Sequence, residues 1–426
     1  MTKFIPISGM EKMLYFNSWN PTVKRPYMLR FQYTLEDDID PSLLTEAVRS
    51  VRKYFWPFRM MLVMHKGEFM YEEIDNEPPV FPFESRTYTL GTEETNGYMY
   101  YILHSENNME FFFAHGVSDT TCFAYFAYFV VKYYCSLKYP EDKGFDIAAA
   151  YRNLNIWETH DPFDYLKKNK VRAPKDFMPK QGYIIPEGAD YIHNDMICLD
   201  FPADSAMEVI KANGVSPVVY FTTLFNRALR EVCGPDEKDI NVTITLDIRR
   251  ITGKNPLTAY SGCTTVEDSS GNDSLSFREH CARNQAAIAS QKTAAYQNNV
   301  VSLSLYSAKV ADLRLLPPAV RAGIIHNMHM IGTKINTYVA TNAGRMQIPS
   351  DKVKCIDGFA SGTESMYMLI TSFRDVLEVK FLSFPGEKKV IDRFVELLGN
   401  EGLETEPYLK RFTEPTRLDI SRLKRV

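Results

Sequence analysis

The pattern of apolar and polar residues predicts strands and helices along the first half of the chain. An apolar stripe at helical spacing begins at Asp40-Pro41, where a proline suits the first position of a helix. A run that is apolar almost all round follows Asp119 and predicts a central buried helix. Strands are predicted where aromatic and β-branched residues gather between turn-forming residues, at 27–34, 60–65, 69–73, 97–103 and 109–114.

The second half of the chain repeats this mixture of strands and helices. Its clearest helix has Ser216 as the cap, Pro217 at the first position and Gly234 as the stop, and another opens with a capping box at residues 276–279. Residues 240–246 alternate strictly, which predicts a strand with one buried face. The remaining predicted elements are strands at 196–199, 337–340, 366–372 and 376–382 and helices at 203–212 and 388–398.

Residues 158–195 have no regular periodicity and are punctuated by proline and glycine. Because a loop of this length is unusual inside a compact domain, we interpret it as a crossover between two lobes, residues 1–175 and 176–426. Both lobes mix strands with helices, without the regular alternation of a doubly wound parallel sheet. The predicted fold class is therefore α+β, a mixed-sheet α/β sandwich.

Composition and charge exclude several classes of function. The chain of 426 residues has a net charge of −4, which provides no long-range attraction for nucleic acid. Its longest apolar run, Cys122 to Val131, falls well short of the roughly 20 residues of a membrane span. Seven cysteines without a CxxC pair indicate reduced thiols rather than a disulfide or zinc framework. Because no leader pattern opens the chain, a cytoplasmic protein is expected.

The chemically informative residue is His115, at the end of the aromatic run 109–114. Signatures of dinucleotide binding, of P-loops and of serine nucleophile elbows do not occur. His326 and His329 have helical spacing, but no carboxylate follows to complete a metal site. His115 is either a structural core residue or a general base, and Asp119 either caps the next helix or pairs with an arginine.

The segment from His115 to Asp119 resembles the HxxxD motif of the chloramphenicol acetyltransferase-like superfamily, which includes BAHD acyltransferases, condensation domains of peptide synthetases and alcohol acetyltransferases. Residues 5–15 are similar to the opening strand and helix of this superfamily. Residues 247–250, followed by 260–262, are similar to its DLR segment, and residues 341–349 are similar to the TNLGR segment of alcohol acetyltransferases. The three stretches come in the order that the superfamily shows. The resemblance runs from about Phe4 to Leu398.

This resemblance implies two pseudo-symmetric lobes with a solvent tunnel between them and His115 midway along it. His115 would act as general base when a hydroxyl or amine acceptor attacks an acyl thioester. Asp119 would be structural and paired with Arg249, and Ser261 and Thr264 are the candidates for stabilising the oxyanion. Acyl-coenzyme A or an acyl-carrier thioester would be the co-substrate, with no permanently bound cofactor and no metal.

Departures from the superfamily pattern leave alternatives open. Condensation domains carry a second histidine where this chain has Ala114, and most members have glycine where it has Thr120. The DFGWG motif of BAHD enzymes is missing. A stand-alone acyltransferase of the alcohol acetyltransferase type, acting on a small-molecule acceptor, fits best. One alternative is a catalytically inactive relative that serves as a binding or docking protein. Another is a small-molecule binding protein with an aromatic cleft. A carrier protein is a further candidate partner.

Overall fold

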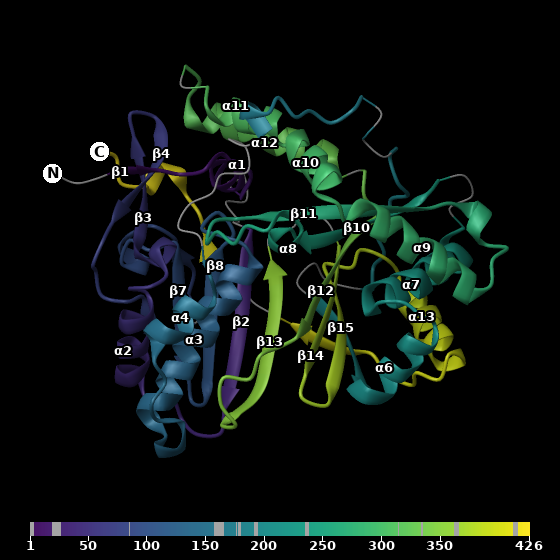
Figure 1. Ribbon diagram of the computed structural model, residues 1–426, viewed down its shortest axis with the longest axis horizontal. Coiled ribbons are helices and arrows are strands. Elements are labelled where there is room, and N and C mark those ends of the chain that lie inside the picture. Colours follow the sequence, from purple (N-terminus) through teal and green to yellow (C-terminus); the bar gives the residue numbers. More distant parts are fainter. Residues whose placement is uncertain are drawn as a thin grey trace.

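The computed structural model contains two mixed sheets that lie side by side, with most helices on their outer sides (Figure 1). The chain termini lie close together beside β1 (Phe4–Pro6) and β4 (Glu68–Glu73) (Figure 1). This mixture of sheets and helices confirms the predicted α+β class. The structure describes residues 4–18, 27–84, 86–156, 166–175, 177, 180–190, 195–234, 238–313, 315–333, 335–361, 366–411 and 416–426.

The first sheet contains the strand that leads to His115. Among the described residues it has five strands, in the order β13 (Val353–Ser361), β2 (Met28–Leu35), β8 (Asn108–Ala114), β7 (Tyr100–Ser105) and β5 (Val80–Pro82). Two helices pack together beside it, α2 (Pro41–Val51), which starts at Pro41 as predicted and is capped by Asp40, and α3 (Thr120–Lys138). The aromatic residues of β8 and α3 stack in the core, with the rings of Phe113 and Phe123 4.6 Å apart. This packing fixes the end of β8 relative to the start of α3.

The second sheet forms the other half of the molecule. Within the described ranges it has seven strands, β11 (Ser261–Asp268), β10 (Ile240–Asp247), β12 (Tyr338–Arg345), β14 (Tyr367–Phe373), β15 (Val376–Leu382), β9 (Asp195–Pro202) and β16 (Tyr408–Arg411), in that order. The predicted helices at 203–212, 217–233 and 388–398 correspond to α6 (Ala203–Ala212), α7 (Pro217–Cys233) and α13 (Lys388–Asn400). The predicted capping box of Ser276 and Glu279 opens α9 (Phe277–Gln291).

The prediction that residues 240–246 bury only one face is wrong. Residues 240–244 are all buried, because β10 lies between β11 and β12 and the sheet is covered on both sides at this point. The polar residues on its second face bond across the sheet instead of facing water: Thr243 Oγ1 lies 3.2 Å from Thr265 Oγ1 and 2.6 Å from Asn336 Oδ1. Alternation in this strand therefore separates an apolar core face from a polar but covered face.

The division into lobes at residues 175 and 176 stays a prediction, and β13 crosses it. This strand, from the second half of the sequence, pairs antiparallel with β2 at the edge of the first sheet. The end of the chain also returns to the first half, where β17 (Thr416–Arg417) pairs with β6 (Tyr88–Thr89). Part of the predicted crossover, including residues 158–165 and 191–194, lies outside the described residues.

Several of the remaining elements lie along the upper edge of the molecule in Figure 1. The strands predicted at 60–65 and 69–73 correspond to β3 (Met60–His65) and β4, which pair antiparallel as a hairpin, and β4 also pairs with β1. Beside it lie α1 (Gly9–Ser18), α11 (Leu305–Ala311) and α12 (Pro318–Thr333), while α10 (Ala294–Leu303) contacts β11 and α4 (Ile147–Asn153) follows α3 in the chain. In the parts of the chain that the structure describes, none of the helices combines the length and apolar character needed to cross a membrane.

Candidate active site at the junction of the two sheets

His115 lies at the end of β8, in the turn that leads into α3. Its backbone N–H donates to the carbonyl of Tyr27, which precedes β2, at 2.8 Å. Gly116 allows the turn to pass close to α1, because a Cβ at this position would lie 2.4 Å from Cδ1 of Tyr15. The histidine is therefore positioned by the first sheet on one side and by α1 on the other.

The imidazole of His115 is held in one tautomer by the backbone. Its Nδ1 lies 2.9 Å from the carbonyl oxygen of Ser118. Because a carbonyl can only accept, Nδ1 carries the proton and Nε2 has the free lone pair. Among the described residues nothing hydrogen-bonds to Nε2. The ring is half-buried between Tyr27 and Phe123, at centroid distances of 4.6 and 6.5 Å.

Burial lowers the pKa of His115 below its ordinary value of about 6.5. Desolvation disfavours the imidazolium, and this effect exceeds the opposing influence of the Asp119 charge and of the Ser118 carbonyl. At neutral pH the side chain is therefore an uncharged imidazole with an available lone pair. That is the form that a general base needs.

Asp119 caps α3 and also forms an ion pair, so both interpretations left open by the sequence describe its contacts. Its Oδ1 accepts from the backbone N–H of Cys122 at 3.2 Å and from Arg249 Nη2 at 3.1 Å. Its Oδ2 accepts from Arg249 Nη1 at 2.8 Å and from the N–H of Tyr260 at 2.7 Å. These four donors occupy the lone-pair positions of a carboxylate. These contacts favour the structural role expected of Asp119, which stays a prediction.

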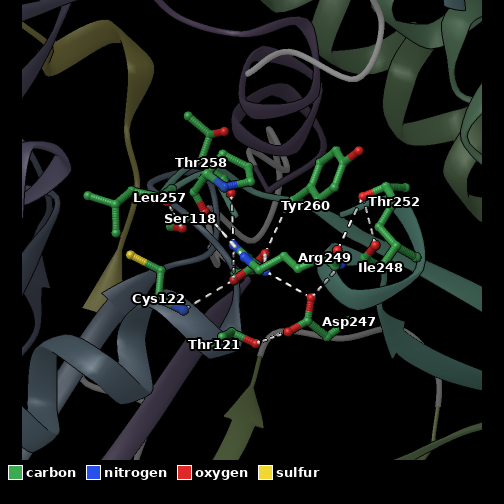
Figure 2. A network of polar contacts seen from close by, with 12 residues as sticks. Ser118, Thr121, Cys122, Asp247, Ile248, Arg249, Thr252, Leu257, Thr258 and Tyr260 are labelled. Carbon is green, nitrogen blue, oxygen red and sulfur yellow. Dashed lines mark hydrogen bonds and ion pairs between the residues drawn. The ribbon is translucent and has the colours of Figure 1, made fainter. Parts of the chain in front are cut away.

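Arg249 is the centre of the polar network that Figure 2 shows. Its side chain is 7% exposed and also donates to the carbonyls of Pro256 and Thr258, at 2.9 and 3.2 Å, and to Asp247 at 3.2 Å. Burial by itself disfavours the guanidinium charge, but Asp119 outweighs it and the pKa of Arg249 is raised. The ion pair joins the start of α3, from the first half of the chain, to the segment after β10, from the second.

Two further hydrogen bonds tie the same segments together. Ser118 Oγ donates to the carbonyl of Leu257, and Thr121 Oγ1 lies 3.1 Å from Asp247 Oδ2. In Figure 2 these residues surround Arg249 from both sides. A narrow recess beside Arg249 is lined by Cys122, Tyr125, Ile156, Asn255, Pro256 and Leu257.

The structure separates the two oxyanion candidates. Ser261, at the start of β11, lies on the face of the second sheet that carries Tyr367, as the register through Thr265, Thr243 and Val339 shows. Thr264 lies on the opposite face, is fully buried beside Val266 and has no partner for its hydroxyl among the described residues. Thr264 therefore points into the helix-covered core, away from the junction.

Sequence reasoning missed a tyrosine pair beside His115. The hydroxyl of Tyr27 lies 2.9 Å from the hydroxyl of Tyr367, the first residue of β14. This contact joins the two sheets next to the imidazole. No local signal marks it, because the two residues are 340 positions apart and meet only through the arrangement of the sheets. The solvent tunnel that the resemblance implies stays a prediction.

Comparison with solved structures places this arrangement in a known fold. No protein-family model matches the sequence, and no curated protein sequence does. Polyketide synthase associated protein 5 from Mycobacterium tuberculosis is similar to the chain with a TM-score of 0.59 and 11% identity, over 93% of this chain and 96% of that one.

Two other solved structures show the same likeness. The condensation domain of the monacolin K polyketide synthase MokA matches with a TM-score of 0.55 and 11% identity, over 93% of this chain and 97% of that one. The cyclization-docking bidomain of EpoB from Sorangium cellulosum matches with a TM-score of 0.55 and 10% identity, over 93% and 84%. The chain therefore has the condensation-domain fold, as its resemblance to this superfamily predicts, while the closer likeness to alcohol acetyltransferases stays a prediction.

Proposed function

We propose that this protein is an acyltransferase that moves an acyl group from a coenzyme A or carrier-protein thioester to a hydroxyl or amine acceptor, with His115 as general base. The observation that carries the proposal is the contact of Nδ1 with the Ser118 carbonyl, which leaves the Nε2 lone pair for the acceptor. The condensation-domain fold of the chain supports it, because proteins of this fold include domains of peptide and polyketide synthases.

The reaction follows from the protonation state of the imidazole. As the acceptor oxygen or nitrogen attacks the thioester carbonyl, Nε2 takes its proton and the imidazole becomes an imidazolium. When the tetrahedral intermediate collapses, the C–S bond breaks and Nε2–H returns the proton to the departing thiolate. The Ser118 carbonyl holds Nδ1–H throughout, so the ring keeps its orientation in both steps. Proton transfer of this kind contributes about 10²–10⁴-fold to the rate.

Asp119 and Arg249 are positioning residues in this scheme. They hold the turn of residues 115–119 against the second half of the chain, and the turn holds the imidazole. Ser261 is retained as the candidate donor to the oxyanion because it lies on the Tyr367 face, whereas the orientation of Thr264 disfavours that role.

The proposal is tested by release of free thiol from acetyl- and octanoyl-coenzyme A in the presence of primary alcohols and amines. We expect release by the wild type, its loss in His115→Ala and its retention in His104→Ala, a matched control at the end of β7. Full activity of His115→Ala would overturn the assignment of the base. If the wild type bound the thioester saturably but released no thiol with any acceptor, the inactive binding or docking protein would be the correct interpretation.

A further inference from the structure

The helices α10, α11 and α12 form an arm along the upper edge of the molecule in Figure 1, outside both sheets. We use the word arm for residues 294–333. Its inner side is firmly attached, because Arg321 is fully buried, with Nη1 3.4 Å from Oε1 of Glu68 on β4 and the guanidinium 5.0 Å from the ring of Phe16 on α1. Ala322 and Ile325 are buried on the same side. The arm is therefore a fixed part of the fold.

The arm also exposes several large apolar side chains, which is unusual for surface helices. Among the described residues twelve large apolar side chains are exposed, and six of them belong to this arm. Tyr306 is 66% exposed and Leu315, in the turn between α11 and α12, is 99% exposed. The other four are Leu303, Leu313, Val320 and Ile324. Exposed apolar residues gathered in this way mark a surface that binds something else.

The charge of this segment is opposite to that of the protein. From Lys292 to Lys334 the sequence has five basic residues and one acidic residue, Asp312, whereas the whole chain has a net charge of −4. The single acid is neutralised, because its Oδ1 lies 2.6 Å from Lys12 Nζ. Arg321 is buried and paired with Glu68, whereas Lys309 in α11 and Lys292, two residues before the arm, are exposed. Within its described residues the arm thus combines exposed apolar side chains with the exposed positive charge of Lys309.

We propose that the outer side of the arm is a docking surface for an anionic membrane. Insertion of apolar side chains at the headgroup boundary together with attraction of lysine and arginine to anionic lipids is how proteins bind a bilayer without spanning it. Leu315 lies in a turn just before Pro317 and Pro318 and is exposed on all sides. Such a side chain can enter lipid directly, whereas a folded acidic protein would need a cavity that matches it. Leu315 therefore favours a bilayer over an acidic protein partner. The exposed ring of Tyr306 suits the membrane–water interface, because an amphipathic aromatic ring can sit at the level of the lipid headgroups.

The docking surface adjoins the candidate active site. Val301 of α10 and Ala308 of α11 share a buried cluster with Ile248, which precedes Arg249, and with Tyr260, whose backbone N–H donates to Asp119. Membrane binding would therefore bring the junction of the lobes near the lipid surface. The inference concerns a second property of the chain and does not depend on acyl transfer.

Sedimentation of the full chain with vesicles tests this inference. We expect binding to vesicles of phosphatidylcholine mixed with phosphatidylserine, weaker binding at high salt, and little binding to phosphatidylcholine alone. The double variant Tyr306→Ser, Leu315→Ser should reduce the affinity at least about tenfold. Lys309→Glu should also reduce it. Leu409→Ser, which removes another half-exposed leucine on β16, is the matched control and should bind like the wild type.

Melting curves establish that each variant is folded before its binding is compared. The inference is overturned if the wild type stays in the supernatant with anionic vesicles, or if the double variant sediments like the wild type. It is also overturned if the wild type ignores vesicles but co-elutes with an acidic acyl carrier protein through these residues. Because thiol release is measured separately, an active protein that does not bind vesicles would refute only this inference.

Discussion

The hydroxyl of Tyr27 lies 2.9 Å from that of Tyr367, and the ring of Tyr27 packs 4.6 Å from that of His115. One side chain thus joins the two sheets and covers the imidazole. We expect Tyr27→Ala to admit water to His115 and raise its pKa toward the ordinary value of about 6.5, because burial is what lowers it. An NMR titration of the imidazole measures the change. Tyr367→Phe, which removes a hydroxyl but leaves the Tyr27 ring in place, should keep the pKa low, and an equal pKa in both variants would contradict the argument.

The pH dependence of thiol release should report the lowered pKa of His115. The base must be neutral, so kcat/KM rises with pH as the imidazolium loses its proton and then stays level. Because the pKa lies below about 6.5, the rise should be complete by neutral pH. Rate measurements across the acid range test this expectation. A midpoint above pH 7 would show that His115 is not the titrating base.

Loss of one partner of the Asp119–Arg249 pair should destabilise the fold strongly. Both side chains are buried, so Asp119→Asn or Arg249→Ala leaves an uncompensated polar group and should cost about 3–5 kcal/mol. The double variant should lose less than the sum, because the second change removes the group that the first left unpaired. Urea unfolding of the three variants provides the cycle. Arg49→Ala, which breaks the exposed pair with Glu77, serves as control and should hardly change stability. Unchanged melting of Asp119→Asn with full activity would refute the structural role.

A second buried polar network, in the core beside the second sheet, should make the free energy of unfolding depend on pH. Burial alone would raise the pKa of Asp268, but hydrogen bonds from His280, Asn272 and Asn226, at 3.0, 2.8 and 2.7 Å, lower it. A carboxylate whose folded pKa is depressed stabilises the protein above its unfolded pKa of about 3.9, and this contribution is lost as pH falls through the folded pKa. Asp268→Asn should therefore be much less stable than the wild type at pH 7.

Chemical denaturation of both proteins from neutral to acid pH measures the difference. The gap in the free energy of unfolding should narrow as the pH falls below about 4. A gap that stays constant over the whole range would mean that the charge of Asp268 contributes nothing. Asp273→Asn, whose carboxylate is half-exposed, controls for the general effect of removing one negative charge from the same region.

Local signals in the sequence predict much of the fold. The cap at Asp40, the stop at Gly234 and the capping box of Ser276 depend on neighbouring residues only, so the helices they bound are found correctly. The strand before His115 and the helix after Asp119 follow from one aromatic run for the same reason.

Elements that depend on distant partners could not be predicted. The strand β13 contains Asp357 and Gly358, a pair that is typical of turns, so its sequence does not indicate a strand. In the structure Asp357 is stabilised by ion pairs with Lys380 and Lys410 from the second sheet. Choosing Arg249 over its neighbour Arg250 required the family resemblance, because spacing alone does not show which guanidinium turns inward. The orientation of Thr264 depends on the register of β11, which the sequence does not state.

The pairing of β13 with β2 also has a consequence for biosynthesis. Strand β2 is translated early, but its neighbour on one side comes from residues 353–361. A nascent chain therefore carries an unpaired strand edge, open to other chains, until residues 353–361 have left the ribosome. The amino-terminal half cannot mature as a unit during synthesis, and production of either half alone would leave an aggregation-prone fragment.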